Sequence, residues 1–281
     1  MPGHVPCRGY RGARGAGPHW PRVQDSDRVV VQVEKPIPQA PASPPLLVIT
    51  AEDYGYARAY SRGILKAAAA GAVDSVSAMV MRPGCDPDPL LGTGVEVGLH
   101  LELEGVSAWG TRWAGPRDRD RATAALREQL ERFERLFGQP AAYVDGHHHC
   151  HAARGLASVL ALAVREQHLP LRSVNPRHRR LLRRAGVATP HRLVGRLRES
   201  EPALPAEIGA LVDGTAQPPP GVVEWMTHPG YRDPTTGSGY DAGREEDLAL
   251  LIELAERGDL RPVRATHAVA LSRPVDSRPG R

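Results

Sequence analysis

The sequence contains few cysteines and few aromatic residues, and it has no long apolar run. Its three cysteines, Cys7, Cys85 and Cys150, are widely spaced, which excludes a disulfide framework and a CxxC zinc motif. No stretch approaches the roughly 18 consecutive apolar residues of a membrane-spanning helix, and residues 1–30 lack the apolar core of a secretory signal. We therefore expect a cytoplasmic protein with no membrane span.

Lysine is almost absent, because the 36 basic residues include only Lys35 and Lys66 and the rest are arginines. The 32 acidic residues are interleaved with them and the net charge is only +4, so we expect no broad positive field and no nucleic-acid partner. The one basic run, RHRRLLRR over 177–184, predicts a surface helix with Leu181 and Leu182 facing the core. An anion-binding patch on this helix is the open alternative.

The chain divides by composition near residue 45. Residues 1–45 are rich in proline and arginine and show almost no helical or strand period, which predicts a disordered N-terminal extension. Residues 46–281 have the length that α/β barrels use as one domain. We therefore expect one folded domain over 46–281.

Short apolar runs alternate with amphipathic stretches from residue 46 to the end. The expected strands are 46–49, 76–80, 95–103, 141–144, 169–174, 222–226 and 263–271. The expected helices are 64–70, 119–137, 156–164 and 245–257. This alternation predicts an α/β fold with a parallel sheet, and at this length a single (β/α) barrel is favoured over an open sheet. No GxGxxG or Walker loop follows a strand, which argues against a nucleotide-binding open sheet.

Polar side chains follow four of the expected strands. They are the acidic pair Glu52-Asp53, His100, the histidine-rich segment 145–151 and His228. The carboxyl ends of barrel strands meet at one rim, and one carboxylate with two imidazoles is the ligand set of many hydrolytic metal sites. Each signal alone has an ordinary explanation, such as a turn aspartate, a core histidine or a solvent-facing polar loop. Their order along successive strand–helix units favours a shared metal site.

Four segments carry a resemblance to a known family. They are TAEDYGYARAYSRGI, VGLHLELEG, YVDGHHHCH and EWMTHPGY, in that order. Together they resemble the YdjC-like carbohydrate deacetylases, which include diacetylchitobiose deacetylases and hopanoid-associated deacetylases. The resemblance extends from about Leu46 to Leu254 and implies a distorted (β/α) barrel. It also implies a divalent-metal-dependent amidohydrolase that removes acetyl groups from N-acetylated sugars or their conjugates, with a homodimer as one assembly to test.

The resemblance also implies roles for individual residues. The metal ligands would be Asp53, His100 and His147, and they would hold one divalent ion, Mg or Zn, with Co or Mn as further candidates. Glu52 would be the general base, and a protonated His228 would deliver a proton to the leaving amine. The expected substrate-binding residues are Tyr54, His149, His151, Arg172 and Tyr231.

Other residues near these motifs have structural explanations. Arg244 is expected to form an exposed pair with an acid such as Glu245, with a substrate contact as the alternative. Trp225 lies within a strand and is expected in the core. Cys150 is expected to point away from the site. Gly146, in place of the family's usual serine, is expected to be a mild change.

The first motif departs from the family pattern at one catalytic position. The family usually has Ala-Asp-Asp-Phe-Gly where this chain has Ala51-Glu52-Asp53-Tyr54-Gly55. Glu52 keeps the carboxylate but adds one methylene, and a shift of about 1 Å in a reacting group can lower a rate about a hundredfold. The alternative function is therefore a catalytically weakened barrel that binds a glycan or a protein partner.

Overall fold

The computed structural model describes residues 46–104, 115–196, 200–213, 215, 221–258 and 264–272. The expected N-terminal extension, 1–45, lies outside these residues. Within them, six parallel strands pair in the order β4-β3-β2-β1-β6-β5. The strands are β1 (Leu46–Tyr54), β2 (Ser75–Ala78), β3 (Glu96–Leu101), β4 (Val144–Gly146), β5 (Arg192–Val194) and β6 (Val222–Thr227).

Short backbone contacts join the two edges of this sheet. Leu171 forms a parallel bridge with Val144 of β4, and its amide donates to the carbonyl of Ala188. The chain continues from Ala188 into β5, which pairs with β6. The sheet is therefore curled, its edges β4 and β5 are linked only through the segment 171–188, and the fold is a distorted (β/α) barrel.

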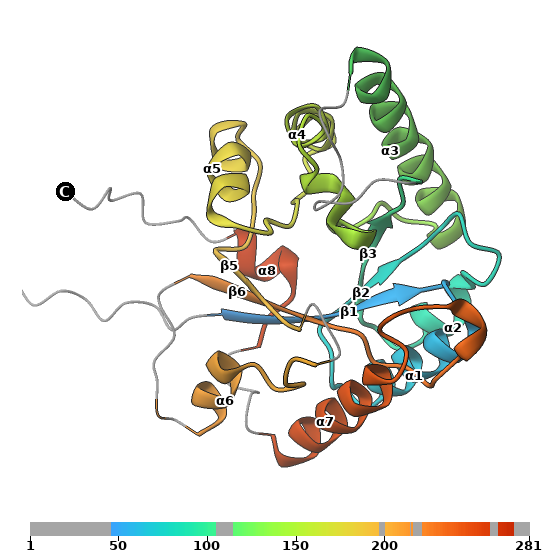
Figure 1. Ribbon diagram of the computed structural model, residues 1–281, viewed down its shortest axis with the longest axis vertical. Coiled ribbons are helices and arrows are strands. Elements are labelled where there is room, and N and C mark those ends of the chain that lie inside the picture. The colour runs from blue at the N-terminus through green and yellow to red at the C-terminus, as the bar shows by residue number, and fades with distance from the viewer. Residues whose placement is uncertain are drawn as a thin grey trace, which may run out of the picture. The chain divides into compact units, whose positions relative to one another are not determined.

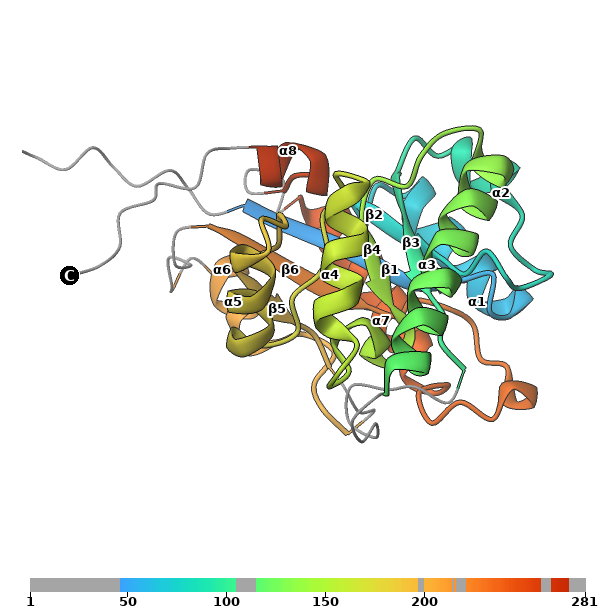
Figure 2. The same ribbon diagram turned by 90° about the horizontal axis from the view of Figure 1, so that it is seen from above.

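Helices lie around the strands (Figures 1 and 2). In Figure 1, α3, α4 and α5 lie above the strands, and α1, α6 and α7 lie below them. The helices are α1 (Arg58–Ala69), α2 (Pro87–Leu91), α3 (Pro116–Phe137), α4 (Ala157–Glu166), α5 (Pro176–Arg184), α6 (Ala206–Val212), α7 (Gly243–Arg257) and α8 (His267–Ser272). Two short 3-10 segments are η1 (His147–Ala152) and η2 (Pro234–Thr236). Within the described chain, every helix is too short or too polar to cross a membrane.

The strongest helical pattern of the sequence is confirmed in α3. Leu126, Phe133 and Phe137 are buried on one face, and Leu130 packs against the same core. The helix ends where Gly138 adopts a left-handed backbone with φ 66°, a conformation that glycine adopts without steric cost. The helix over 177–184 is confirmed as α5, with Leu182 buried and Leu181 partly buried.

Two buried positions on the strands show how tightly the core is packed. Trp225 on β6 is 1% exposed, which confirms its expected place in the core. Tyr143 passes over Gly98 of β3, where an added Cβ would come within 2.4 Å of the tyrosine ring. Any larger residue at position 98 would displace that ring, because real Cβ atoms do not approach other atoms so closely.

Three expected strands are wrong in type or extent. The segment 141–144 contributes only Val144, the first residue of β4. The segment 263–271 forms helix α8 from His267, because Glu96 accepts hydrogen bonds from the backbone amides of His267 and Ala268 at its first turn. The segment 169–174 contributes only the bridge at Leu171. The sequence analysis also missed α2, β5 and α6, which are short elements that tertiary contacts stabilise.

Candidate metal centre

Two consecutive carboxylates end β1, and an irregularity in the strand lets both face the same site. Neighbouring side chains in a regular strand point to opposite faces. Here the pairing of β1 with β2 shifts register between Ala51 and Tyr54, and Asp53 has a left-handed backbone with φ 72°. As a result, Glu52 and Asp53 each lie in a group of potential ligands that includes His100 of β3.

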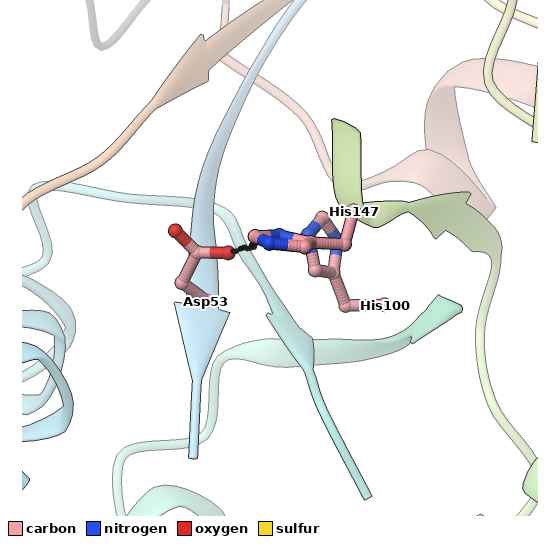
Figure 3. Close-up of side chains that lie close together, drawn as sticks. All are labelled: Asp53, His100 and His147. Carbon is pink, nitrogen blue, oxygen red and sulfur yellow. Dashed lines mark hydrogen bonds and ion pairs between the residues drawn. The ribbon is translucent and has the colours of Figure 1, made fainter. Parts of the chain in front are cut away.

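Asp53, His100 and His147 form the first of these groups (Figure 3). They come from the ends of β1 and β3 and from the start of η1. Asp53 Oδ1 lies 3.3 Å from His100 Nε2 and 3.1 Å from His147 Nδ1, and the three ligand atoms lie within 4.8 Å of one another. Asp53 and His100 are buried, whereas His147 is partly exposed.

A buried carboxylate orients His100. Asp145 Oδ1 lies 2.7 Å from His100 Nδ1, and Asp145 Oδ2 accepts a hydrogen bond of 2.6 Å from Ser77 Oγ. Burial would lower the pKa of His100, but Asp145 and Asp53 on its two ring nitrogens outweigh this and raise the pKa to about 10. A cation that binds Nε2 must displace a proton, so its binding weakens as pH falls.

Asp53 is held as a carboxylate from a second side. Arg244 Nη2 donates to Asp53 Oδ2 at 2.5 Å, and the arginine side chain is buried. Burial would raise the pKa of the Asp53 carboxyl, but Arg244 and the nearby rings of His100 and His147 hold it well below its usual range. The expected exposed pair between Arg244 and Glu245 is therefore wrong, because Arg244 points inward from the first turn of α7.

This first group fits a divalent cation. It offers one carboxylate oxygen and two imidazole nitrogens, and among the described residues His100 Nε2 has no hydrogen-bond partner. A histidine whose other nitrogen contacts a carboxylate is the usual form of a metal-binding histidine. The second group of potential ligands, Glu52, His100 and Asp145, already includes two carboxylates paired with the guanidinium of Arg172, which makes it a poorer cation site.

Arg172 lies inside the barrel, next to the carboxylates of the candidate site. It is 1% exposed and contacts Glu52, Asp145 (2.9 Å) and Glu224 (2.6 Å). Glu224 also lies 3.2 Å from His267 Nε2, which places a further positive group beside it. Arg172 was expected to bind substrate, but its position shows that it orients carboxylates inside the barrel.

Glu52 lies between Arg172 and His228. Its Oε1 atom accepts from Arg172, and its Oε2 atom lies 3.3 Å from His228 Nε2. Burial together with Arg244, His100 and His147 keeps the pKa of His228 well below its usual range, although Asp53 acts in the opposite direction. These surroundings favour the neutral imidazole, whereas the expected role of His228 as an acid requires that it gain a proton during the reaction.

Two of the expected substrate-binding residues have other partners. Tyr54 is 1% exposed, and its hydroxyl donates to the carbonyl of Asp86 at 2.6 Å, ahead of α2. Tyr231 is partly buried, and the guanidinium of Arg62 lies 5.3 Å from its ring centre. Neither residue contacts the ligand group through a hydrogen bond or ion pair that the described chain shows.

The histidine segment divides into an outer and an inner part. His149 and His151 are buried, and the ring centre of His151 lies 6.1 Å from that of His149 and 5.6 Å from that of His178 of α5. Burial lowers the pKa of His149 to about 4 and that of His178 to about 4, so both are neutral. His148 is exposed instead, with its ring centre 4.0 Å from that of His147. The expected substrate-binding residues His149 and His151 therefore lie on the buried side of this segment.

A partly exposed tyrosine beside His147 was missed. Tyr56 lies with its ring centre 5.5 Å from that of His147, and the guanidinium of Arg82 lies 4.9 Å from the Tyr56 ring centre. An aromatic residue directly after the Gly55 turn was the available sequence signal. Tyr56 and His148 are therefore the aromatic rings that lie against the outer side of His147.

The side chains of His151 and Cys150 pack closely against Gly146. An added Cβ at Gly146 would lie 2.8 Å from His151 Nδ1 and 2.9 Å from Cys150 Sγ. A serine at this position would therefore require movement of both side chains, so glycine is not the mild change expected. Cys150 is buried and its thiol donates to the carbonyl of Leu101, as expected for a residue directed away from the ligands.

The fold and the ligand group define a (β/α) barrel with a candidate metal centre at the carboxyl ends of its strands. The model of the family described as YdjC-like protein matches residues 46–261. The chain belongs to this family.

Comparisons with individual proteins show more distant similarity. The chain is 29% identical over 148 residues to a protein named chitooligosaccharide deacetylase from Serratia marcescens, and to its namesake from Yersinia pestis. Each alignment covers 45% of this chain and 58% of the relative. A solved structure from Enterococcus faecalis, described as a proposed cellobiose-phosphate cleavage protein, covers 81% of this chain and 99% of its own. Its TM-score is 0.65 at 21% identity, which supports the fold alone.

Proposed function

We propose that this protein is a divalent-metal-dependent hydrolase that removes an N-acetyl group from an amino sugar or an amino-sugar conjugate. The observation that carries the proposal is the convergence of Asp53, His100 and His147 beside the Glu52–His228 pair. The names of the curated relatives agree with this reaction. Because the alignments reach just over half of those relatives, the activity and substrate remain part of the proposal.

Asp53, His100 and His147 would hold the metal. A bound divalent ion polarises a carbonyl group and lowers the pKa of water, which are the two effects that amide hydrolysis requires. Asp145 orients His100 so that Nε2 faces Asp53, and Arg172 contacts both Asp145 and Glu52. One buried guanidinium therefore positions a proposed metal ligand and the proposed base together.

Glu52 would remove the proton from the attacking water. Its Oε1 atom is fixed by Arg172, which leaves Oε2 near His228 as the atom that accepts the proton. His228, whose Nε2 lies 3.3 Å from Glu52 Oε2, would receive that proton and pass it to the leaving nitrogen. The additional methylene of glutamate is accommodated because Arg172 and His228 hold the carboxylate from two directions.

Substrate contacts would come from the outer side of the site. Tyr56 offers an aromatic ring of the kind that sugar rings pack against, and the exposed His148 offers ring nitrogens for hydroxyl groups. Both lie beside His147. They replace Tyr54 and Tyr231 as the proposed contacts.

Acetate release tests the proposal. The purified protein is treated with EDTA, loaded separately with Zn, Co, Mn or Mg, and given N-acetylglucosamine oligosaccharides and lipid-linked N-acetylglucosamine. We expect release only with metal, and an Asp53→Asn variant that neither binds metal nor releases acetate. Stoichiometric metal without acetate release from any substrate would contradict the reaction, and failure to bind any metal would contradict the ligand assignment.

A further inference from the structure

Arg244 has only one polar side-chain partner in the described part of the protein. It is 2% exposed, and Nη2 donates to Asp53 Oδ2 at 2.5 Å. Its Nε and Nη1 atoms are buried and have no hydrogen-bond partner among the described residues. A buried guanidinium with two unused nitrogens is energetically unfavourable, so its contact with Asp53 needs an explanation.

The surroundings of Arg244 fix the direction of its side chain. The guanidinium lies 3.5 Å from the ring centre of Tyr60, and the Tyr60 hydroxyl donates to Asp241 at 2.9 Å. Gly230 lies against both: its added Cβ would lie 3.1 Å from Arg244 Cδ and 3.2 Å from Tyr60 Cα. An added Cβ at Gly63 would lie 2.4 Å from Gly230 Cα. Close packing of Gly230 and the Tyr60 ring against Arg244 therefore leaves its side chain little freedom, and the guanidinium extends to Asp53.

The two oxygens of Asp53 consequently have different surroundings. Oδ1 faces the nitrogens of His100 and His147, at 3.3 Å and 3.1 Å. Oδ2 faces Arg244. A carboxylate held in this way can offer a cation one oxygen but not both, because binding through both would require breaking the contact with Arg244.

We propose that Arg244 is a positioning residue that restricts Asp53 to single-oxygen metal coordination, so that coordination positions remain open for water and substrate. The proposal rests on the ligand group of the proposed function. Asp53 is the one negatively charged ligand, since histidines bind metals as neutral imidazoles. Arg244 compensates that charge, so the bound ion keeps its ability to polarise a carbonyl group.

Cobalt substitution tests the proposal independently of activity. Visible absorption of bound Co(II) falls as its coordination number rises, so it reports whether Asp53 binds through one oxygen or two. We expect Arg244→Met to bind Co(II) with weaker absorption per bound ion and to have kcat about 10- to 100-fold lower, with KM changed much less. Arg244→Lys should restore most of the wild-type spectrum, because an ammonium group can donate to the same oxygen.

A matched variant controls for loss of a buried arginine. Arg264 contacts Asp74 at 2.9 Å, at the opposite end of the strands, and Arg264→Met should leave the cobalt spectrum and kcat unchanged. An unchanged spectrum in fully loaded Arg244→Met would overturn the proposal. If Arg244→Met does not fold, Arg244→Gln is the second variant, and an unchanged cobalt spectrum in that fully loaded variant would overturn the proposal. Absence of acetate release by the wild type would contradict the proposed function but would leave this spectral comparison valid.

Discussion

The two ends of the barrel use the same kinds of residue differently. At the amino ends of the strands, Glu96 accepts from the backbone and side chain of His267, and Asp74 accepts from Arg264 and from a backbone amide. At the carboxyl ends, His228 Nδ1 and two Arg244 nitrogens have no hydrogen-bond partner among the described residues. Paired charges stabilise one end, whereas unsatisfied groups at the other are available to a ligand.

Backbone strain is also concentrated at the carboxyl ends of the strands. Four described non-glycine residues have positive φ, and three of them, Asp53, His148 and His149, belong to the candidate site. A left-handed backbone destabilises an ordinary residue by roughly 1–2 kcal/mol. The backbone at the carboxyl end is therefore locally less stable, and this conformation places the side chains of the candidate site, as is common at functional sites.

The largest expected effect is on activity at the carboxyl end. Glu52→Gln removes the proposed base but keeps its size, so we expect kcat to fall about 10²- to 10⁴-fold. Metal content should stay at the wild-type value, because Glu52 is not a proposed ligand. Acetate release and elemental analysis on the same preparation measure both quantities.

Glu52→Asp controls for the length of the side chain. If the site is adapted to glutamate, the shorter carboxylate loses its contacts with Arg172 and His228, and kcat falls about a hundredfold. A large increase in kcat would instead identify a catalytically weakened site, which is the alternative function inferred from the sequence.

The next effect is on stability in the barrel centre. Arg172→Met leaves Glu52, Asp145 and Glu224 without their shared cation, and removing one partner of a buried ion pair destabilises a protein by about 3–5 kcal/mol. Urea denaturation at pH 7 measures the free energy of unfolding. Arg192→Met is the control, because its pair with Glu207 is exposed and should contribute less than about 1 kcal/mol.

A pH effect is expected from the amino end. Burial would lower the pKa of His267, but Glu224 and Glu96 outweigh it and raise the pKa to about 9. Because the folded value exceeds the unfolded value of about 6.5, this stabilisation is complete below about pH 6.5 and is lost as pH rises through 9. The free energy of unfolding should fall by up to ~3 kcal/mol over that range. His267→Asn should show a flatter profile, and an equally steep profile would contradict the assignment.

A small gain is expected from relieving strain. His148 is exposed and has φ 51°, so His148→Gly removes a left-handed histidine without emptying the core. We expect the free energy of unfolding to rise by about 0.5–1 kcal/mol after allowing for the greater flexibility of glycine in the unfolded chain. The same variant should raise KM if His148 contacts substrate. His168→Gly, at φ 56° outside the ligand group, is the control for stability alone.

The smallest effect is expected on α5. Arg183 is exposed, and Arg183→Ala should change the free energy of unfolding by no more than about 0.5 kcal/mol. Retention on heparin should be weak and unaffected by the change. Strong retention that the variant abolishes would support the anion-binding alternative for residues 177–184.

The sequence predicted the fold where local patterns were strong. The apolar face of α3, the strands β1, β3 and β6, and the alternation of strands and helices could all be recognised from periodicity. The segment 263–271 could not, because an apolar run of this length fits a strand or a helix equally well. Its type was decided by Glu96, which lies far away in sequence and caps the first turn of α8.

The candidate site was predictable as a set of residues but not as a geometry. The motifs indicated Asp53, His100 and His147, which the structure brings together. They did not indicate that Arg244 turns inward, that Arg172 is enclosed by carboxylates, or that His148 is exposed while His149 and His151 are buried. These outcomes depend on contacts between segments separated by up to 191 positions, such as Arg244 with Asp53.

The sequence by itself determined the class of fold, the family and the chemical types available at the strand ends, because periodicity and motif spacing are local properties. Tertiary structure alone decided that one oxygen of Asp53 faces Arg244 and the other faces His100 and His147. It also decided the surroundings of His228 and the irregularity that directs both Glu52 and Asp53 to one site. Hydrogen bonds and charge interactions act over a few ångströms in space, so their partners are fixed only when the barrel closes.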